Sequence, residues 1–167
     1  VLLLSAIGGF AAADGAARIL AGGTDLLVQM RAGMIAPGLI VDIKNIAETM
    51  AIEETADGGF IVGAAVSGTA LAAHPGFAKA WPGVLEGLNL IGSTQIQGRA
   101  SLGGNLCNGS PAADSVPALV AAGATLTVQG PKGRRDIAVE EVPTGPGKTS
   151  LAPGEIVGAH IYHNPAV

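Results

Sequence analysis

The sequence predicts a folded domain in which short helices and short strands alternate. Hydrophobic residues make up 49% of the 167 residues and charged residues only 13%, so the chain can bury a core and disorder is not expected. Glycine, at 26 of 167 residues, is about twice as frequent as the usual ~7%, which predicts many tight turns and close backbone approaches. No internal repeat or low-complexity segment interrupts this pattern.

The first part of the chain predicts a strand, a helix and a second strand. Residues 18–20 end a strand and lead into a glycine-rich loop. Residues 25–34 have helical periodicity, with Gly33 near the end. The apolar face of this helix contains Leu26, Leu27, Met30 and Met34. Residues 39–43 (LIVDI) are a mainly apolar run, which predicts a buried strand.

The rest of the chain predicts two hairpins, two helices and a final strand. Asp57-Gly58-Gly59 is a strong hairpin turn signal. The hairpins are expected over residues 51–64 and 124–138, the helices over residues 67–73 and 82–90, and the last strand over residues 155–162. Pro82 suits the first turn of its helix. The first unit ends near residues 45–56, so we expect one lobe over residues 1–55 and a second over residues 56–167.

Two glycine-rich loops are the most informative feature. They are Ala21-Gly22-Gly23-Thr24-Asp25 and Ser101-Leu102-Gly103-Gly104-Asn105. Glycine allows the backbone to approach a ligand closely, and a concavity of backbone N–H groups holds an anion without lysine or arginine. Each loop alone is more simply a plain turn. Together, each before an expected helix, they are compatible with a diphosphate held from two sides, and a side chain at residue 103 would then obstruct it.

Charge and cysteine content exclude several classes of function. The formal net charge of −4 gives no basic face for nucleic acid. Cys107 is the single cysteine, so this chain alone cannot supply a disulfide, a four-cysteine iron–sulfur cluster or a thiolate zinc site. We therefore expect no metal site here, and any redox chemistry would use an organic cofactor.

The apolar residues 1–13 do not predict a membrane segment. This run is shorter than the ~20 residues that a spanning helix needs, and no basic region precedes it as in a signal peptide. We expect a soluble, cytoplasmic chain without membrane insertion.

Three apparent motifs are better explained structurally. Gly147-Lys148-Thr149 resembles the end of a P-loop, but Val142 stands where that motif needs glycine. His160 and His163 would point to opposite faces of a strand, and we expect an edge strand with exposed polar residues. Cys107 and His74 form a nucleophile pair only in principle. A small buried cysteine beside a glycine loop is the simpler interpretation.

Two polar positions allow two interpretations each. Asp114, or Ser110, would cap a helix near Pro117, or Asp114 would accept a hydrogen bond from a ligand hydroxyl or ring N–H. Thr24 would likewise cap the helix after the first loop, or contact a ligand. The residues themselves do not decide between these roles.

Three segments resemble one family in the right order along the chain. Residues 19–33 (ILAGGTDLLVQMRAG) with 39–46 (LIVDIKNI), residues 91–119 (IGSTQIQGRASLGGNLCNGSPAADSVPAL) and residues 145–157 (GPGKTSLAPGEIV) resemble the FAD-binding subunit of the molybdenum hydroxylases, which include xanthine, aldehyde and carbon monoxide dehydrogenases. The resemblance implies the two-lobed α+β FAD-binding fold of vanillyl-alcohol oxidase. The family's C-terminal lobe is expected to be absent here.

The same resemblance implies the cofactor-binding residues. The implied contacts are Ile19, Leu20, Ala21, Gly22, Gly23, Thr24, Asp25, Leu26, Ile91, Ser101, Leu102, Gly103, Gly104, Asn105, Asp114 and Val157. The two loops would hold the diphosphate, Asp114 would contact the dinucleotide, and Ile91 and Val157 would line the cofactor. Gly98 stands where the family commonly has asparagine, and Ser101 replaces the usual threonine but keeps its hydroxyl.

The implied function is electron transfer through FAD, with no catalytic acid or base in this chain. Electrons would pass from [2Fe–2S] clusters of a small subunit through FAD to NAD or another acceptor, while a large subunit carries molybdopterin. The complex would be a dimer of heterotrimers. The alternatives are a flavin-free scaffold that docks partner subunits, and a stand-alone FAD-dependent oxidase.

Overall fold

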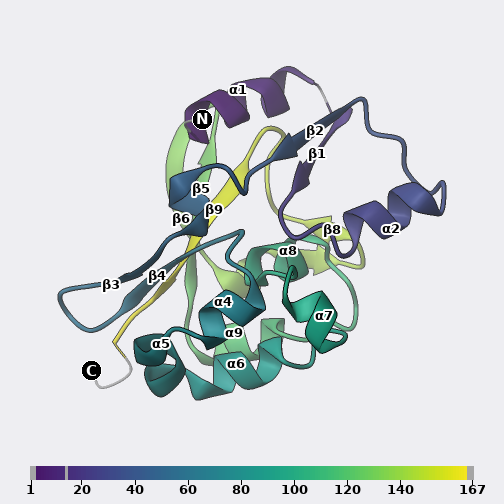
Figure 1. Ribbon diagram of the computed structural model, residues 1–167. Coiled ribbons are helices and arrows are strands. Elements are labelled where there is room, and N and C mark those ends of the chain that lie inside the picture. Colours follow the sequence, from purple (N-terminus) through teal and green to yellow (C-terminus); the bar gives the residue numbers. More distant parts are fainter. Residues whose placement is uncertain (1–2, 14, 165–167) are drawn as a thin grey trace.

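The computed structural model describes residues 3–13 and 15–164 of the chain. Its largest sheet has five antiparallel strands in the order β3-β4-β9-β5-β6 (Figure 1). These strands are β3 (Ile52–Glu54), β4 (Phe60–Gly63), β5 (Thr125–Gly130), β6 (Gly133–Ala138) and β9 (Ile156–Tyr162). Strand β9 pairs with β4 on one side and with β5 on the other, so it joins two hairpins that are distant in sequence.

The structure confirms both predicted hairpins. Each turn contains a glycine at the position where the backbone has a positive φ. Gly58 has a φ of +82° between β3 and β4, and Gly133 has a φ of +114° between β5 and β6. The register pairs Glu54 with Phe60 in the first hairpin and Gly130 with Gly133 in the second.

A group of short helices packs against this sheet and forms the main core. They are α4 (Gly68–Ala72), α5 (Pro75–Ala80), α6 (Pro82–Leu88), α7 (Thr94–Gln97), α8 (Leu102–Cys107) and α9 (Val116–Ala121), and a 3-10 turn, η1 (Val139–Glu141), follows β6. Phe77, Leu88 and Leu119 are fully buried in one cluster with Leu126 and Val128 of β5. The predicted helices over residues 67–73 and 82–90 are confirmed, with somewhat different ends.

The helix α5 is among those that were not expected from the sequence. Helix α4 ends just before His74-Pro75, and α5 begins at this step. The His74 side chain caps α5, because its Nδ1 atom accepts a hydrogen bond from the Phe77 N–H at 3.2 Å. Proline is compatible with the first helical turn, where the N–H has no helical partner. A single histidine–proline step therefore separates two helices without a loop.

The N-terminal segment adds a small parallel sheet beside the large one. Its elements are α1 (Leu3–Ala12), β1 (Ala17–Leu20), α2 (Leu26–Arg31), β2 (Leu39–Asp42) and α3 (Ala47–Met50). Strands β1 and β2 are parallel and pair Ile19 with Val41. A second apolar cluster joins Leu3 and Ile7 of α1 to Ile43, Ala65 and Ile156, so this unit packs directly against the rest of the chain. Among the described helices, none is both long and apolar enough to cross a membrane.

The predicted burial of this N-terminal unit is partly wrong. The helix and the strand form, but no residue of α2 is buried, and Leu27 and Met34 are 48% and 72% exposed. Leu39 and Ile40 of the expected buried strand are also exposed. Parallel strands are normally covered on both faces. Here α1 packs against β1 and β2, but the side chains of Leu39 and Ile40 and those of Leu27 and Met34 remain exposed to solvent. Periodicity identified an apolar face, but it could not show whether another element covers it.

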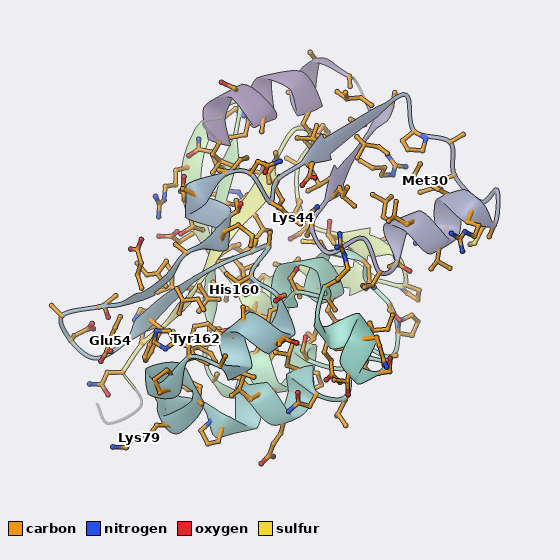
Figure 2. The ribbon with its side chains drawn as sticks, viewed as in Figure 1. Met30, Lys44, Glu54, Lys79, His160 and Tyr162 are labelled. Carbon is orange, nitrogen blue, oxygen red and sulfur yellow. The ribbon has the colours of Figure 1, made fainter. Side chains whose placement is uncertain are left out.

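The expectation of an edge strand around residue 160 is wrong. Strand β9 is central, and His160 is fully buried opposite Val62 and Leu126. Only His163, beyond the end of the strand, is exposed. The His160 ring stacks on Tyr162, with 6.5 Å between the centroids, and Figure 2 shows both side chains along β9. Neither ring nitrogen of His160 has a hydrogen-bond partner among the described residues, and burial lowers its pKa to about 4.

We expect His160 to make the fold acid-sensitive. Its folded-state pKa of about 4 lies below the ordinary 6.5, so the unfolded chain binds a proton more readily. The free energy of unfolding should therefore fall as the pH drops from 6.5 to 4, by at most about 3 kcal/mol, while the histidine is neutral in both states at higher pH. In His160→Leu this part of the pH dependence should disappear.

Urea denaturation at pH 7.5 and pH 4.5 measures this effect. The exposed His163→Leu variant is the matched control and should keep the wild-type pH dependence. A His160→Leu variant that loses as much stability on acidification as the wild type would contradict the assignment.

Candidate cofactor-binding site

The structure brings the two glycine-rich loops together. The first loop joins β1 to α2 (Figure 1). The second segment was expected to be a loop before a helix, but only Ser101 precedes α8, and residues 102–105 form its first turn. A Cβ atom on residue 22 would lie only 1.9 Å from the carbonyl oxygen of Arg99, so the two backbones are in direct contact there. A Cβ atom on residue 104 would lie 3.9 Å from the Cβ of Ala21. Glycine is required at residue 22 because any side chain would force the loops apart.

A cavity of about 870 Å³ lies along both loops. Its volume falls within the range of ~300–1,000 Å³ that is usual for small-molecule sites. The predicted site residues that line it are Ile19, Ala21, Gly22, Gly23, Thr24, Asp25, Leu26, Ile91, Ser101, Gly103, Gly104, Asn105, Asp114 and Val157. Segments as distant in sequence as residues 19 and 157 therefore line the same cavity.

Two predicted site residues do not line the cavity. The Leu102 side chain is 2% exposed and belongs to the main core. Leu20 is half-buried in β1, and its Cδ1 atom would lie 2.9 Å from a Cβ atom on residue 23. Both leucine side chains therefore pack against protein, while residues adjacent to them in the sequence line the cavity.

The first loop presents N–H groups that have no protein partner. Residues 22–25 lie between β1 and α2, and within the described residues their N–H groups make no hydrogen bond. At the second loop the N–H of Gly103 is likewise unpaired, whereas Gly104 donates to the Ser101 Oγ at 3.1 Å. Unpaired backbone donors on the wall of a cavity are suited to an anionic ligand.

The polar side chains of the second loop mainly hold the loop in place. Asn105 Oδ1 accepts hydrogen bonds from the Ser115 N–H and the Ser115 hydroxyl, at 3.2 and 2.7 Å. Ser101 Oγ caps α8 through the bond from Gly104. These bonds connect the second loop to α9 and fix the direction of its backbone.

Asp114 does not act as a helix cap. The cap residue of α9 is Ser115, without a side-chain cap bond, and the carboxylate of Asp114 accepts no hydrogen bond from any described residue. The preceding Ala113 has a φ of +46°, in the left-handed region that alanine adopts at a cost of roughly 1–2 kcal/mol. This strained residue places Asp114 on the cavity wall. Ser110, the other capping candidate, instead accepts from the Ala112 N–H.

The capping alternative for Thr24 is also not observed. The cap residue of α2 is Asp25, which makes no side-chain cap bond and instead accepts from the Gln29 Nε2 at 2.7 Å. Thr24 therefore keeps its hydroxyl available at the cavity wall.

Several lining residues were missed by the sequence reasoning. The largest groups are Phe10 and Ala11 of α1 and residues 151–156, with Ile96, Ser110 and Thr149. Nothing in the local pattern marks α1 as part of a site, because its contribution depends on how it folds back over the chain. Ile96, Ser110, Thr149 and residues 151–156 lay within the segments that carried the family resemblance, and this was the signal that could have found them.

The rejected motifs have structural roles. Lys148 and Thr149 form the short strand β8, which pairs with β7 (Pro143–Gly145), so no helix follows as a P-loop requires. Cys107 is half-buried at the end of α8 and packs against the main core, where burial raises the pKa of its thiol to about 12. His74 caps α5 and does not line the cavity. Across the described ranges, no cluster of three potential metal-ligating side chains is found.

Comparison with known proteins places these observations in a family. The chain matches the family described as the FAD binding domain in molybdopterin dehydrogenase over residues 4–161. It is 36% identical over 149 residues to the xanthine dehydrogenase FAD-binding subunit of Escherichia coli O157:H7, covering 89% of this chain and 50% of that protein. It is 32% identical over 143 residues to the carbon monoxide dehydrogenase medium chain of Afipia carboxidovorans, covering 86% and 49%.

A solved structure shows the same fold. Reconstituted CO dehydrogenase from Oligotropha carboxidovorans matches with a TM-score of 0.93 and 29% identity, over 98% of this chain and 57% of that chain. The chain thus spans about half the length of the curated relatives that it matches.

The two glycines of the second loop should respond differently to an added methyl group. A Cβ atom on Gly103 would lie 2.6 Å from the Ala64 carbonyl oxygen, whereas one on Gly104 would lie 3.1 Å from the Ser101 Oγ. Gly103→Ala should therefore lower the free energy of unfolding by about 1–3 kcal/mol, and Gly104→Ala should change it by less than ~1 kcal/mol. Urea denaturation of both variants tests this, and equal losses would contradict it.

The expectation that residue 103 is glycine to admit a ligand needs correction, because the backbone of Ala64 already requires glycine there.

Proposed function

The chain belongs to the family of FAD-binding domains of molybdopterin dehydrogenases, and we propose that it binds FAD with the diphosphate between its two glycine-rich loops. The observation that carries this proposal is the set of unpaired N–H groups of residues 22–25 on the cavity wall. Trans peptide N–H groups that converge on one point stabilise anionic oxygen atoms without a counter-charge.

The residues present fit such a ligand. Among the described lining residues Arg18 is the one basic side chain, and its guanidinium donates to the carbonyl groups of Gly15 and Ala17. Backbone donors would therefore hold the diphosphate. The Asp114 carboxylate, free of protein donors, would accept a hydrogen bond from a ribose hydroxyl or a ring N–H. Ile91 and Val157, 7% and 5% exposed, would supply apolar contacts to the rings.

The chain would act as the flavin-binding part of an oxidoreductase. FAD, when bound, supplies a group that accepts electrons from one partner and passes them to another. The protein's own contribution is to bind and orient the dinucleotide, and this requires no acid–base residue. The Cys107 thiol, with its raised pKa, is protonated at neutral pH and is not suited to such a role.

The wider assembly is part of the same proposal. Electrons would come from [2Fe–2S] clusters of a small subunit and leave to NAD or another acceptor, with molybdopterin on a large subunit, in a cytoplasmic dimer of heterotrimers. The fold would be of the two-lobed vanillyl-alcohol oxidase type, divided into residues 1–55 and 56–167. What supports this is the family membership and the match to a CO dehydrogenase structure.

Two alternatives give different expectations. A flavin-free scaffold has no need for a cavity lined with unpaired donors. A stand-alone oxidase would place a histidine or another base beside the flavin, and no histidine is among the described lining residues. Both observations favour the flavin-binding subunit.

Titration of the purified chain with FAD, followed by flavin fluorescence and calorimetry, tests the binding site. Gly104→Asp adds a carboxylate beside Ala21, and both residues line the cavity, so repulsion from the diphosphate should weaken FAD binding by at least about tenfold. Gly83→Asp adds the same charge to the exposed start of α6, where nothing lies within 4 Å of a Cβ atom, and should bind like the wild type. FAD binding that is equal in both variants would place the diphosphate elsewhere, and no binding by the folded wild type would favour the scaffold.

Asp114→Asn should weaken FAD binding by about fivefold to tenfold, because a charged acceptor to a ligand hydroxyl or N–H is lost. Asp57→Asn, in the exposed β3–β4 turn, removes the same charge away from the cavity and should have no effect. The comparison is made by calorimetry with FAD at pH 7.5. An unchanged dissociation constant in Asp114→Asn would show that its carboxylate does not contact the dinucleotide.

A further inference from the structure

Two basic side chains bind the carbonyl groups of the first glycine loop from outside the cavity. The Lys44 Nζ donates to the Ala21 carbonyl oxygen at 2.9 Å, and the Arg99 Nε donates to the Gly22 carbonyl oxygen at 3.3 Å. Lys44 follows β2, and Arg99 precedes α8, so the two donors come from segments that are distant in sequence. Figure 2 shows Lys44 beyond the end of β2. Neither side chain is among the residues that line the cavity.

Peptide geometry links these carbonyl groups to the donors on the other side. In a trans peptide the C=O of one residue and the N–H of the next point in opposite directions, and the described chain has no cis peptide bond. Holding the Ala21 carbonyl outside therefore turns the Gly22 N–H inward, and holding the Gly22 carbonyl does the same for the Gly23 N–H. Glycine pairs rotate readily about their flanking bonds, so without such bonds these peptide planes would not stay in one orientation.

Lys44 is itself held in position. Asp42 Oδ1 accepts from both the backbone N–H and the Nζ of Lys44, at 2.9 and 2.8 Å. The side chains of Lys44 and Asp42 are 27% and 40% exposed, so the ion pair contributes little stability by itself. Its effect is to direct the ammonium group toward the Ala21 carbonyl.

We propose that Lys44 and Arg99 are positioning residues that fix the two peptide planes of Ala21–Gly22 and Gly22–Gly23, so that the loop N–H groups face the diphosphate. This inference rests on the proposed FAD binding. The two side chains act through the backbone and do not contact the ligand. Their positive charge neutralises the carbonyl dipoles on the outer side of the loop, which would otherwise be free to turn toward the anion.

The test compares variants that remove the donor with one that keeps it. Lys44→Met and Arg99→Met should each weaken FAD binding by about tenfold, measured by flavin fluorescence, while Lys44→Arg should stay within about threefold of the wild type because it can still donate to the carbonyl. Lys79→Met, an exposed lysine of α5 (Figure 2), removes the same charge away from the cavity and should bind normally. Urea denaturation of each variant verifies that the chain is folded.

Salt dependence separates positioning from direct contact. If Lys44 or Arg99 attracted the phosphates as a charge, 1 M NaCl would remove most of the difference between the variant and the wild type. If they orient the peptide planes, the tenfold difference should persist at 1 M NaCl.

The outcomes are distinguishable. Wild-type affinity in both methionine variants, or a difference that disappears in salt, would overturn this inference alone. No FAD binding by the folded wild type would overturn the proposed function and this inference with it. Arg99→Met serves as an independent second variant, because it acts on a different carbonyl from another segment.

Discussion

Contact between backbone and backbone, at positions where only glycine fits, is the constraint on which the rest of the structure depends. Gly22 lies against the carbonyl of Arg99, and Gly103 lies against Ala64 at the end of β4. The first contact joins the N-terminal unit to the second loop, and the other fixes that loop to the large sheet. These two contacts fix the distance between the two glycine-rich segments, along which the cavity lies.

The apolar contacts reinforce the same arrangement. Ile43 lies just after β2, and it packs with Ala65 and Ile156 from the ends of the large sheet. The two sheets thus meet at their strand ends, where the loops emerge, and burial of these side chains keeps the loops adjacent without a covalent link. The polar bonds from Asn105 to Ser115 then extend the fixed region to α9.

Much of the local structure was predictable because it depends on residues that are close in sequence. The hairpin turns contain Gly58 and Gly133 at positive φ, and such turn chemistry is visible without knowledge of the fold. The first glycine-rich loop could be identified in the same way, whereas residues 102–105 of the second segment form part of α8. The family resemblance extended the predicted site to Asp114 and Val157, which line the cavity. The features that could not be predicted depend on distant neighbours. The sequence around His160 does not show that β9 lies between two strands, and the apolar face of Leu27 and Met34 does not show that nothing covers it. Similarly, the reason for glycine at residue 103 lies in Ala64, about 40 positions earlier in the chain.

The order of strands also has a consequence for how the chain reaches its native state. The hairpins β3–β4 and β5–β6 can each form from local sequence, but they belong to one sheet only through β9, which is the last of the described strands. Until residues 156–162 leave the ribosome, each hairpin has one unpaired inner edge, and unpaired strand edges invite association with other chains. Completion of the sheet is therefore a late, non-local event, and folding should be slow compared with the formation of the hairpins themselves.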